Sequence, residues 1–324
     1  MFNELSPQEI KFCIAIPVRN GEEFLEQSIL SIISQKGNFD LHLHIQDGKS
    51  EDATLEIIKK FERLVKTGEF GSRINLTWNS TSDDSMWNAL NIAFEYLSGT
   101  HYGWIGFDDL LLPGSLSTVA EFFRQYPSQH WVTGLNCLRN ENGIQFAIQP
   151  GRSTHAIAEG FSATEIINGT YDGNRATRIQ AEGTFWDSEL WINSGEFFSE
   201  EYSLAGDAEL WMRFAQYSEV VQIVSQLGSF RSREMQLSSN KNLYLEQEKQ
   251  ICASYSKKIG LSDKQLVAYT SYPDGLWTLL RTESSFHHKT LVSLIRRTLK
   301  YILVKIIGKS SMRKLKWLIL KFLG

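Results

Sequence analysis

The chain has 324 residues, of which 42% are hydrophobic, 12% aromatic and 22% charged. This composition is typical of a globular protein and excludes disordered, collagen-like and disulfide-scaffold chains. The formal charge of −4 favours neither a nucleic acid nor a membrane as partner. Three widely spaced cysteines, Cys13, Cys137 and Cys252, predict neither a disulfide framework nor a close-spaced zinc site, and they indicate a reducing compartment.

Residues 1–11 include Glu4 and Glu9 and no apolar run, so we expect no signal peptide. The sequence also lacks any stretch of about 18 uncharged apolar residues. We therefore expect no ordinary membrane-spanning helix.

Residues 10–130 alternate short apolar runs with helical periodicity, the pattern of a mainly parallel sheet covered by helices. The runs predict buried strands over residues 12–18, 41–45, 74–78 and 102–107. One helix is expected from about Glu22, and a second after Ser50 as its N-cap. A third is expected over residues 85–97, and a fourth with Pro113 in its first turn. The predicted fold class is α/β with a doubly wound sheet.

From about residue 130 to 180 the pattern loosens into short strands and polar loops, which favours a substrate-facing region over a second core. Helical periodicity returns over residues 187–194 and 207–217, and an apolar run predicts a strand over 220–224.

Polar side chains stand where each predicted strand of the first half ends: Arg19 and Asn20, then Asp47, then Asp83 and Asp84, then Asp108 and Asp109. The carboxyl ends of parallel strands form one crevice, so these side chains are expected to lie together. Converging carboxylates repel one another unless a cation or a ligand's donors intervene. Mg²⁺ or Mn²⁺ with phosphate oxygens would suit them, which indicates a diphosphate ligand. The alternative is that they are only loop and cap residues.

Other common sites are not predicted. The first strand is not followed by GxGxxG, and residues 308–310 (Gly-Lys-Ser) fail as a phosphate loop because position 303 is leucine. HExxH and GxSxG are also missing, which excludes the common zinc-protease and hydrolase routes. His42 and His44 share one face of a strand and are expected to be structural.

Short segments in both halves of the chain carry a family resemblance. They are residues 16–21 (Ile-Pro-Val-Arg-Asn-Gly), 46–54, 83–91 and 104–109 (Trp-Ile-Gly-Phe-Asp-Asp), then 182–186 (Glu-Gly-Thr-Phe-Trp), 205–213, and 230–231 with 236–238. Together they resemble the GT-A glycosyltransferases of family 2, over roughly residues 10–245.

The resemblance implies a Rossmann-like GT-A catalytic domain over residues 1–245. Residues 10–130 would be its nucleotide-sugar-binding half and 131–245 its acceptor and catalytic half. A helical extension over 246–289 and a basic tail over 290–324 would follow.

On the donor side, the resemblance implies that Asp47 and Asp83 bind the nucleotide base and ribose. The backbone of Pro17, Arg19 and Asn20 would line the same pocket.

For the chemistry, the resemblance implies that Asp108 binds a divalent metal, Mn²⁺ or Mg²⁺, beneath the diphosphate, with Asp109 beside it. Asp207 would be the general base that takes the acceptor's proton, and Glu182 an acceptor-side or supporting group. Asp207 also precedes an apolar helical face, so it could instead be only an N-terminal cap.

The sequence departs from the family pattern at several positions. Gly106 stands at the first acidic position of the metal motif, and Asp84 and Ser85 replace a basic residue and a glycine. Arg233 stands where the family usually has histidine, which puts a third metal ligand in doubt. Arg233 could instead supply positive charge to the leaving diphosphate of the nucleotide sugar.

The net charge is divided unevenly along the chain. Residues 1–283 carry 23 basic and 37 acidic side chains, a net −14, whereas residues 284–324 carry 10 basic and none acidic, a net +10. In residues 290–324, apolar and basic positions alternate at helical spacing, which is typical of helices that lie on anionic membranes. The alternative is a helix pair packed on the catalytic domain.

The combined prediction is an inverting, metal-dependent transferase that moves a sugar from a nucleoside diphosphate, with UDP favoured, to a hydroxyl of a glycan or lipid-linked acceptor. It would act in cell-surface polysaccharide biosynthesis, peripherally on the cytoplasmic face of the inner membrane and without nucleic acid. A nucleotidyltransferase on a related fold and an inert nucleotide-sugar-binding subunit stay open as alternatives. The oligomeric state is not predicted.

Overall fold

The computed structural model describes residues 9–148, 157–158, 166, 179–234, 236 and 240–258. The predicted tail at 290–324, and the part of the predicted extension beyond residue 258, lie outside the described residues. Within them, no helix has the length and apolar character needed to cross a membrane.

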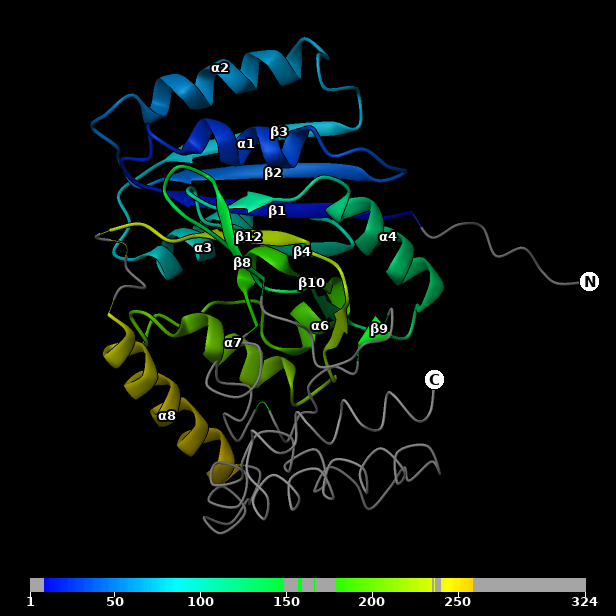
Figure 1. The fold of residues 1–324 in the computed structure, drawn as a ribbon, viewed down its shortest axis with the longest axis vertical. Coiled ribbons are helices and arrows are strands. Elements are labelled where there is room, and N and C mark those ends of the chain that lie inside the picture. Colours follow the sequence, from blue (N-terminus) through cyan, green and yellow to red (C-terminus); the bar gives the residue numbers. More distant parts are fainter. Residues whose placement is uncertain are drawn as a thin grey trace, which may run out of the picture. The chain divides into compact units, whose positions relative to one another are not determined.

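The first half contains the parallel sheet that the sequence predicts. Its strands run in the order β3-β2-β1-β4, each parallel to its neighbour (Figure 1). Their bounds are β1 Lys11–Val18, β2 Asp40–Asp47, β3 Ile74–Ser80 and β4 His101–Trp104. Four helices alternate with the strands: α1 Leu25–Ile33, α2 Thr54–Lys66, α3 Met86–Glu95 and α4 Ser115–Gln125.

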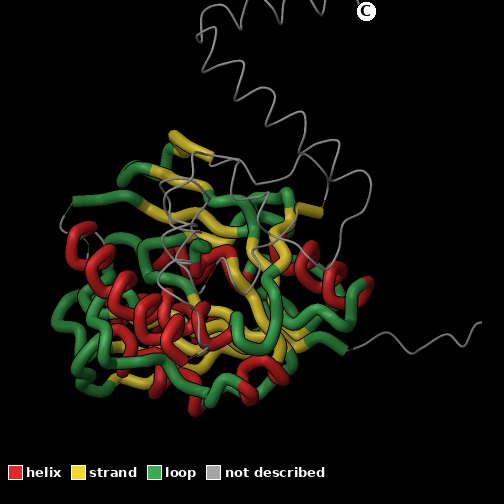
Figure 2. The backbone as a smooth tube through the Cα atoms, turned by 90° about the horizontal axis from the view of Figure 1, so that it is seen from below, coloured by secondary structure: helices red, strands yellow, loops and turns green. Residues whose placement is uncertain are grey.

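Strand β1 separates two hydrophobic layers because successive side chains of a strand point to opposite faces. Ile14 and its even-numbered neighbours belong to the core cluster that contains Ile29 of α1 and Leu116 of α4. Cys13 and Ala15 belong to the other cluster, with Trp87 of α3. Burial on both faces explains why β1 is a continuous apolar run. Figure 2 shows helices (red) packed around these strands (yellow).

The second half extends the sheet with shorter, mixed strands. Beyond β4 the order is β10 (Thr184–Asp187), β6 (Trp131–Thr133), β11 (Val221–Ile223) and β9 (Ile157–Ala158). β10 is antiparallel to both β4 and β6, and the sequence patterns did not predict it.

A second sheet has four strands in the order β5-β12-β7-β8. They are β5 Leu110–Leu111, β12 Gly228–Arg231, β7 Cys137–Arg139 and β8 Gln145–Ile148. Because β5 directly follows the loop after β4 and pairs with β12, this sheet brings residues near 230 to the end of β4.

Helical segments of the second half surround an aromatic core. They are η1 Ala181–Gly183, α6 Ser188–Asn193, α7 Gly206–Phe214 and α8 Lys241–Lys258. The rings of Trp131 and Trp211 stack with centroids 5.6 Å apart, and Trp186 meets Trp211 edge to face at 6.0 Å. The predicted boundary at residue 245 falls inside α8, whose Tyr255 belongs to the same core cluster.

Three local predictions were wrong. Ser50 does not cap α2, which begins at Thr54 after Ala53, because its hydroxyl donates to the Asp47 carboxylate instead. Pro113 precedes α4 rather than lying in its first turn, because Gly114 takes a left-handed conformation (φ 82°) before the helix. The strand predicted over residues 102–107 ends earlier, because β4 stops at Trp104 and the chain then enters the turn that carries the acidic pair.

Ser85 was expected to begin a helix, and it is the N-cap of α3. Its Oγ accepts the backbone N–H of Asn88 at 3.1 Å, which satisfies one of the free donors of the first turn.

Candidate active site

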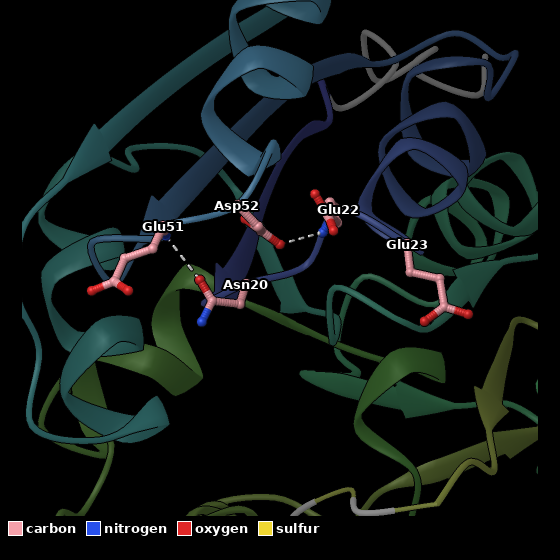
Figure 3. A pocket seen from close by; sticks show the side chains of 5 residues that line it. All are labelled: Asn20, Glu22, Glu23, Glu51 and Asp52. Atoms are coloured by element: carbon pink, nitrogen blue, oxygen red, sulfur yellow. Dashed lines mark hydrogen bonds between the residues drawn. The ribbon is translucent and has the colours of Figure 1, made fainter.

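Two loops at the carboxyl ends of β1 and β2 are joined by hydrogen bonds. Asn20, which has a left-handed backbone (φ 53°), donates its N–H to Ser50 Oγ at 2.8 Å and accepts the N–H of Glu51 at 2.9 Å. Glu22 donates its N–H to Asp52 at 3.1 Å (Figure 3). These contacts hold the exposed residues after β1, including Arg19, at the edge of the sheet.

A hollow of about 430 Å³ lies beside these loops, lined by Asn20, Glu22, Glu23, Glu51 and Asp52 (Figure 3). Four of these five residues are acidic and none is basic. A diphosphate would be repelled there, so the hollow is not a candidate for the donor's anionic group.

Asp47 is fully buried at the end of β2. Its carboxylate accepts hydrogen bonds from the hydroxyls of Ser50 (2.5 Å) and Ser80 (2.6 Å) and from the Ser50 N–H. In this arrangement Asp47 holds the loop together, and its contact with a nucleotide stays a prediction.

Asp83 lies next to the loop that follows Asp47. A Cβ on Gly48 would be 2.5 Å from Asp83 Oδ2 and 3.5 Å from Arg19 Cβ, so a larger residue there would displace the Asp83 carboxylate. Burial raises the pKa of Asp83, the positive charge of Arg19 opposes that rise, and Asp47 and Asp84 add to it. The structure therefore brings together Arg19, Asp47 and Asp83, as the sequence predicted.

The acidic pair after β4 converges on one backbone position. A Cβ on Gly106 would lie 2.7 Å from Asp109 Oδ2 and 3.0 Å from Asp108 Oδ1. Asp109 is buried, and burial raises its pKa well above the usual value, with repulsion from Glu182 and Asp108 adding to the rise. Gly106 therefore leaves room for two carboxylates that face the same side of the turn.

Two arginines compensate this negative charge, Arg231 at the end of β12 and Arg233 two residues beyond it. Arg233 Nε donates to Asp108 Oδ2 at 2.6 Å. Arg231 is buried, donates its backbone N–H to Asp109 at 2.7 Å, and donates its Nε to the Asp108 carbonyl oxygen at 2.7 Å. Arg233 was a predicted site residue. Arg231 belongs to the motif at residues 230–231, but its contacts with the acidic pair were not predicted.

Glu182 reaches the same cluster from η1. Its place is set by backbone contact, since a Cβ on Gly228 would lie 2.1 Å from the Glu182 carbonyl oxygen. The side chain is buried, and its Oε1 has no hydrogen-bond partner among the described residues. Burial raises the pKa of Glu182 to about 8, and repulsion from Asp207 and Asp108 adds to the rise. Glu182 is therefore largely protonated at neutral pH.

Asp207 lies in the first turn of α7, after the N-cap Ala205, so it is not the cap residue. Its Oδ1 accepts the N–H of Ala208 at 2.8 Å and the hydroxyl of Tyr244 at 3.0 Å. The preceding Gly206 is required by packing, because a Cβ there would be 2.6 Å from the Trp87 ring. The interpretation of Asp207 as a cap alone is wrong.

Other candidates take structural roles. Glu209, in the same first turn of α7 as Asp207, is buried and receives Arg213 Nε on both oxygens at 2.9 Å. His42 and His44 both hydrogen-bond to the Thr77 hydroxyl at 2.8 Å, and burial lowers the pKa of His44 to about 4. Pro17 lies within β1, in agreement with the strand predicted over residues 12–18.

The fit to a divalent metal rests on Asp108 and Asp109. Among the described residues, no group of three or more His, Cys, Asp or Glu side chains is arranged to hold a metal ion. Mg²⁺ needs fewer protein ligands, since it binds through one or two carboxylates together with phosphate oxygens and water. The two hard oxygen donors over Gly106 fit that chemistry.

Comparison with known proteins bears directly on this edge of the sheet. Residues 13–165 match the family model described as Glycosyl transferase family 2. These residues belong to glycosyltransferase family 2. The family 2 domain includes the donor-side residues and the acidic pair, whereas Glu182, Asp207 and Arg233 follow the matched region.

One relative is the minor teichoic acid biosynthesis protein GgaB of Bacillus subtilis (strain 168), 24% identical over 159 residues. The match covers 48% of this chain but only 16% of GgaB, so the chain corresponds to a small part of that protein.

Two solved structures of S. aureus TarS (residues 1–349) share the fold. The complex with UDP-GlcNAc has a TM-score of 0.60 and 16% identity, covering 85% of this chain and 77% of TarS. The complex with UDP has a TM-score of 0.52 and 13% identity, covering 84% and 78%. The predicted GT-A fold, with its largely parallel central sheet, is confirmed.

Proposed function

We propose that this protein transfers a sugar from a UDP-sugar to a hydroxyl of a glycan or lipid-linked acceptor in cell-surface polysaccharide biosynthesis, with inversion at the transferred carbon. The observation that carries the proposal is the convergence of Asp108, Asp109, Glu182 and Asp207, with Arg233 paired to the first of them. Further support comes from the family 2 domain, from the UDP and UDP-GlcNAc bound by TarS, and from the teichoic acid role in the name of GgaB.

Asp207 is the general base in this proposal. An alcohol is a poor nucleophile, so a carboxylate must take its proton as the new bond to the sugar forms. Glu182 is unsuited to this role because its pKa of about 8 leaves it protonated at neutral pH. A protonated Glu182 can donate a hydrogen bond to the acceptor or the donor sugar, which is the supporting role expected of it.

The departing diphosphate needs positive charge. Arg233 supplies a guanidinium next to Asp108, and its rigid planar donors match phosphate oxygens well. A divalent cation held by Asp108 and Asp109 would supply further charge there. Both carboxylates would be ionised in that state, because metal ligands must lose their protons.

Replacing Asp207 tests the proposed base. Asp207→Asn keeps the shape of the side chain and its acceptor oxygen but cannot take a proton. We expect turnover to fall by about 100-fold or more, while calorimetric UDP affinity stays within twofold of native. Turnover equal to that of the native protein would place the base elsewhere.

The metal proposal is tested by calorimetry with UDP and Mn²⁺. Donor binding should weaken by at least about tenfold in Asp108→Ala, and similarly in the native protein when a chelator is added. Equal UDP affinity with and without chelator in the native protein would contradict the metal role.

We further propose that residues 290–324 hold the enzyme peripherally on the cytoplasmic face of the inner membrane, where a lipid-linked acceptor would be found. The support is the +10 charge of residues 284–324 and the amphipathic spacing of the tail. The full chain should cosediment with anionic vesicles and not with zwitterionic ones, and a chain ending at residue 289 should lose this binding. Equal cosedimentation of both chains with anionic vesicles would contradict the proposal.

A further inference from the structure

Helix α8 lies against α7, outside the matched family 2 region (Figure 1). Its buried residues Tyr244, Glu248, Ile251, Cys252 and Tyr255 follow one another at intervals of four, three, one and three. This spacing forms one stripe along a helix. Tyr244, Ile251 and Tyr255 belong to the same core cluster as Trp211 of α7. α8 is therefore a packed part of the catalytic half.

The same helix holds the chain that leads into Asp207. Gln247 Oε1 accepts the backbone N–H groups of Leu204 (2.9 Å) and Ala205 (3.1 Å). Its Nε2 donates to Ser203 Oγ at 3.0 Å. Ala205 is the N-cap of α7 and has no side chain that can cap the helix. Gln247 thus fixes the start of α7 from outside that helix.

Tyr244 contacts the proposed base directly. Its hydroxyl donates to Asp207 Oδ1 at 3.0 Å, and the same oxygen accepts the N–H of Ala208 at 2.8 Å. Two donors on one carboxylate oxygen restrict rotation of the side chain about its terminal bond. A carboxylate held in one orientation keeps its alignment with the acceptor hydroxyl, and small misalignments reduce rates strongly.

We propose that α8 orients the general base, with Tyr244 as the positioning residue for Asp207. This inference rests on the proposed function, since it assigns a role to Tyr244 only if Asp207 takes the acceptor's proton. Tyr244 acts through Asp207, and no contact between Tyr244 and the substrate is proposed.

Tyr255 offers a matched comparison on the same stripe of α8. Its hydroxyl donates to Glu209 Oε1 at 2.6 Å, and Glu209 has no role in the proposed mechanism. Glu209 is bound to Arg213, which also donates to the Ser194 carbonyl oxygen at 2.7 Å. Loss of the Tyr255 hydroxyl therefore disturbs a buried structural network but leaves Asp207 and its partners in place.

The experiment compares Tyr244→Phe with Tyr255→Phe in the full chain. The rate is measured as UDP release from the UDP-sugar that the native protein turns over fastest in a panel that includes UDP-GlcNAc. Tyr244→Phe should lower kcat by about tenfold, with the donor KM within twofold of native and the Tm nearly unchanged. Tyr255→Phe should lower the Tm and leave kcat at 25 °C near that of the native protein.

Gln247→Met provides a second variant, because it removes the acceptor for the two N–H groups before α7 and should also lower kcat more than it changes the donor KM. Native kcat in Tyr244→Phe, or an equal fall of kcat in Tyr244→Phe and Tyr255→Phe, would overturn the positioning role. If Asp207→Asn is inactive while Tyr244→Phe has native kcat, only this inference fails. If Asp207→Asn keeps native turnover, the proposed base itself is wrong.

Discussion

Repulsion among four carboxylates at one edge of the sheet is the constraint on which the candidate site depends. Asp108, Asp109, Glu182 and Asp207 come from three separate segments, and the charges of Asp108, Glu182 and Asp207 each raise the pKa of another member. Such a cluster is unstable unless protons, cations or hydrogen-bond donors offset its charge. In this protein, the raised pKa of Glu182 keeps a proton on that side chain, and Arg231 and Arg233 supply positive charge beside Asp108 and Asp109.

The second half of the fold supplies the positive charge and the space that the carboxylate cluster requires. The short strand β5 follows the acidic turn and pairs with β12. This pairing places Arg231 and Arg233 beside Asp108 and Asp109, although they are more than 120 residues apart in sequence. Gly228 allows β12 to touch the backbone of Glu182, and Gly106 leaves room for the two aspartates. The missing side chains of these two glycines allow the close contacts on which the cluster depends.

The first half of the fold could be predicted because its signals are local. The hydrophobic pattern of the sequence predicts a buried strand such as β1 and an amphipathic helix such as α1. The parallel topology then predicts that polar residues at the ends of the strands lie together. The second half could not be predicted in the same way. Strand β10 has four residues and no distinctive pattern, and its antiparallel insertion depends on partners more than 50 residues away.

Particular site residues show the same division. Asp108, Asp207 and Arg233 were predicted from motifs, but Arg231, which contacts the acidic pair, and Tyr244, which contacts Asp207, were not. Arg231 could have been suspected from its place in a quoted motif, whereas nothing local distinguishes Tyr244 from other tyrosines. Ser50 was assigned to a helix cap because its spacing fits one, and the competing bond to Asp47 becomes visible only in three dimensions.

The central claim is that burial, with added repulsion from Asp207 and Asp108, keeps Glu182 protonated. With its pKa raised from 4.5 to about 8 in the folded state, Glu182 holds a proton that the unfolded chain releases. Its contribution therefore makes stability fall as pH rises between those two values. The most direct test is the Tm of the native protein and of Glu182→Gln from about pH 5 to about pH 8.5 in the presence of chelator.

Glu182→Gln should be increasingly more stable than the native protein as the pH rises, whereas Glu121→Gln, at an exposed site on α4, should follow the native curve. Parallel curves for the native protein and Glu182→Gln would contradict the account.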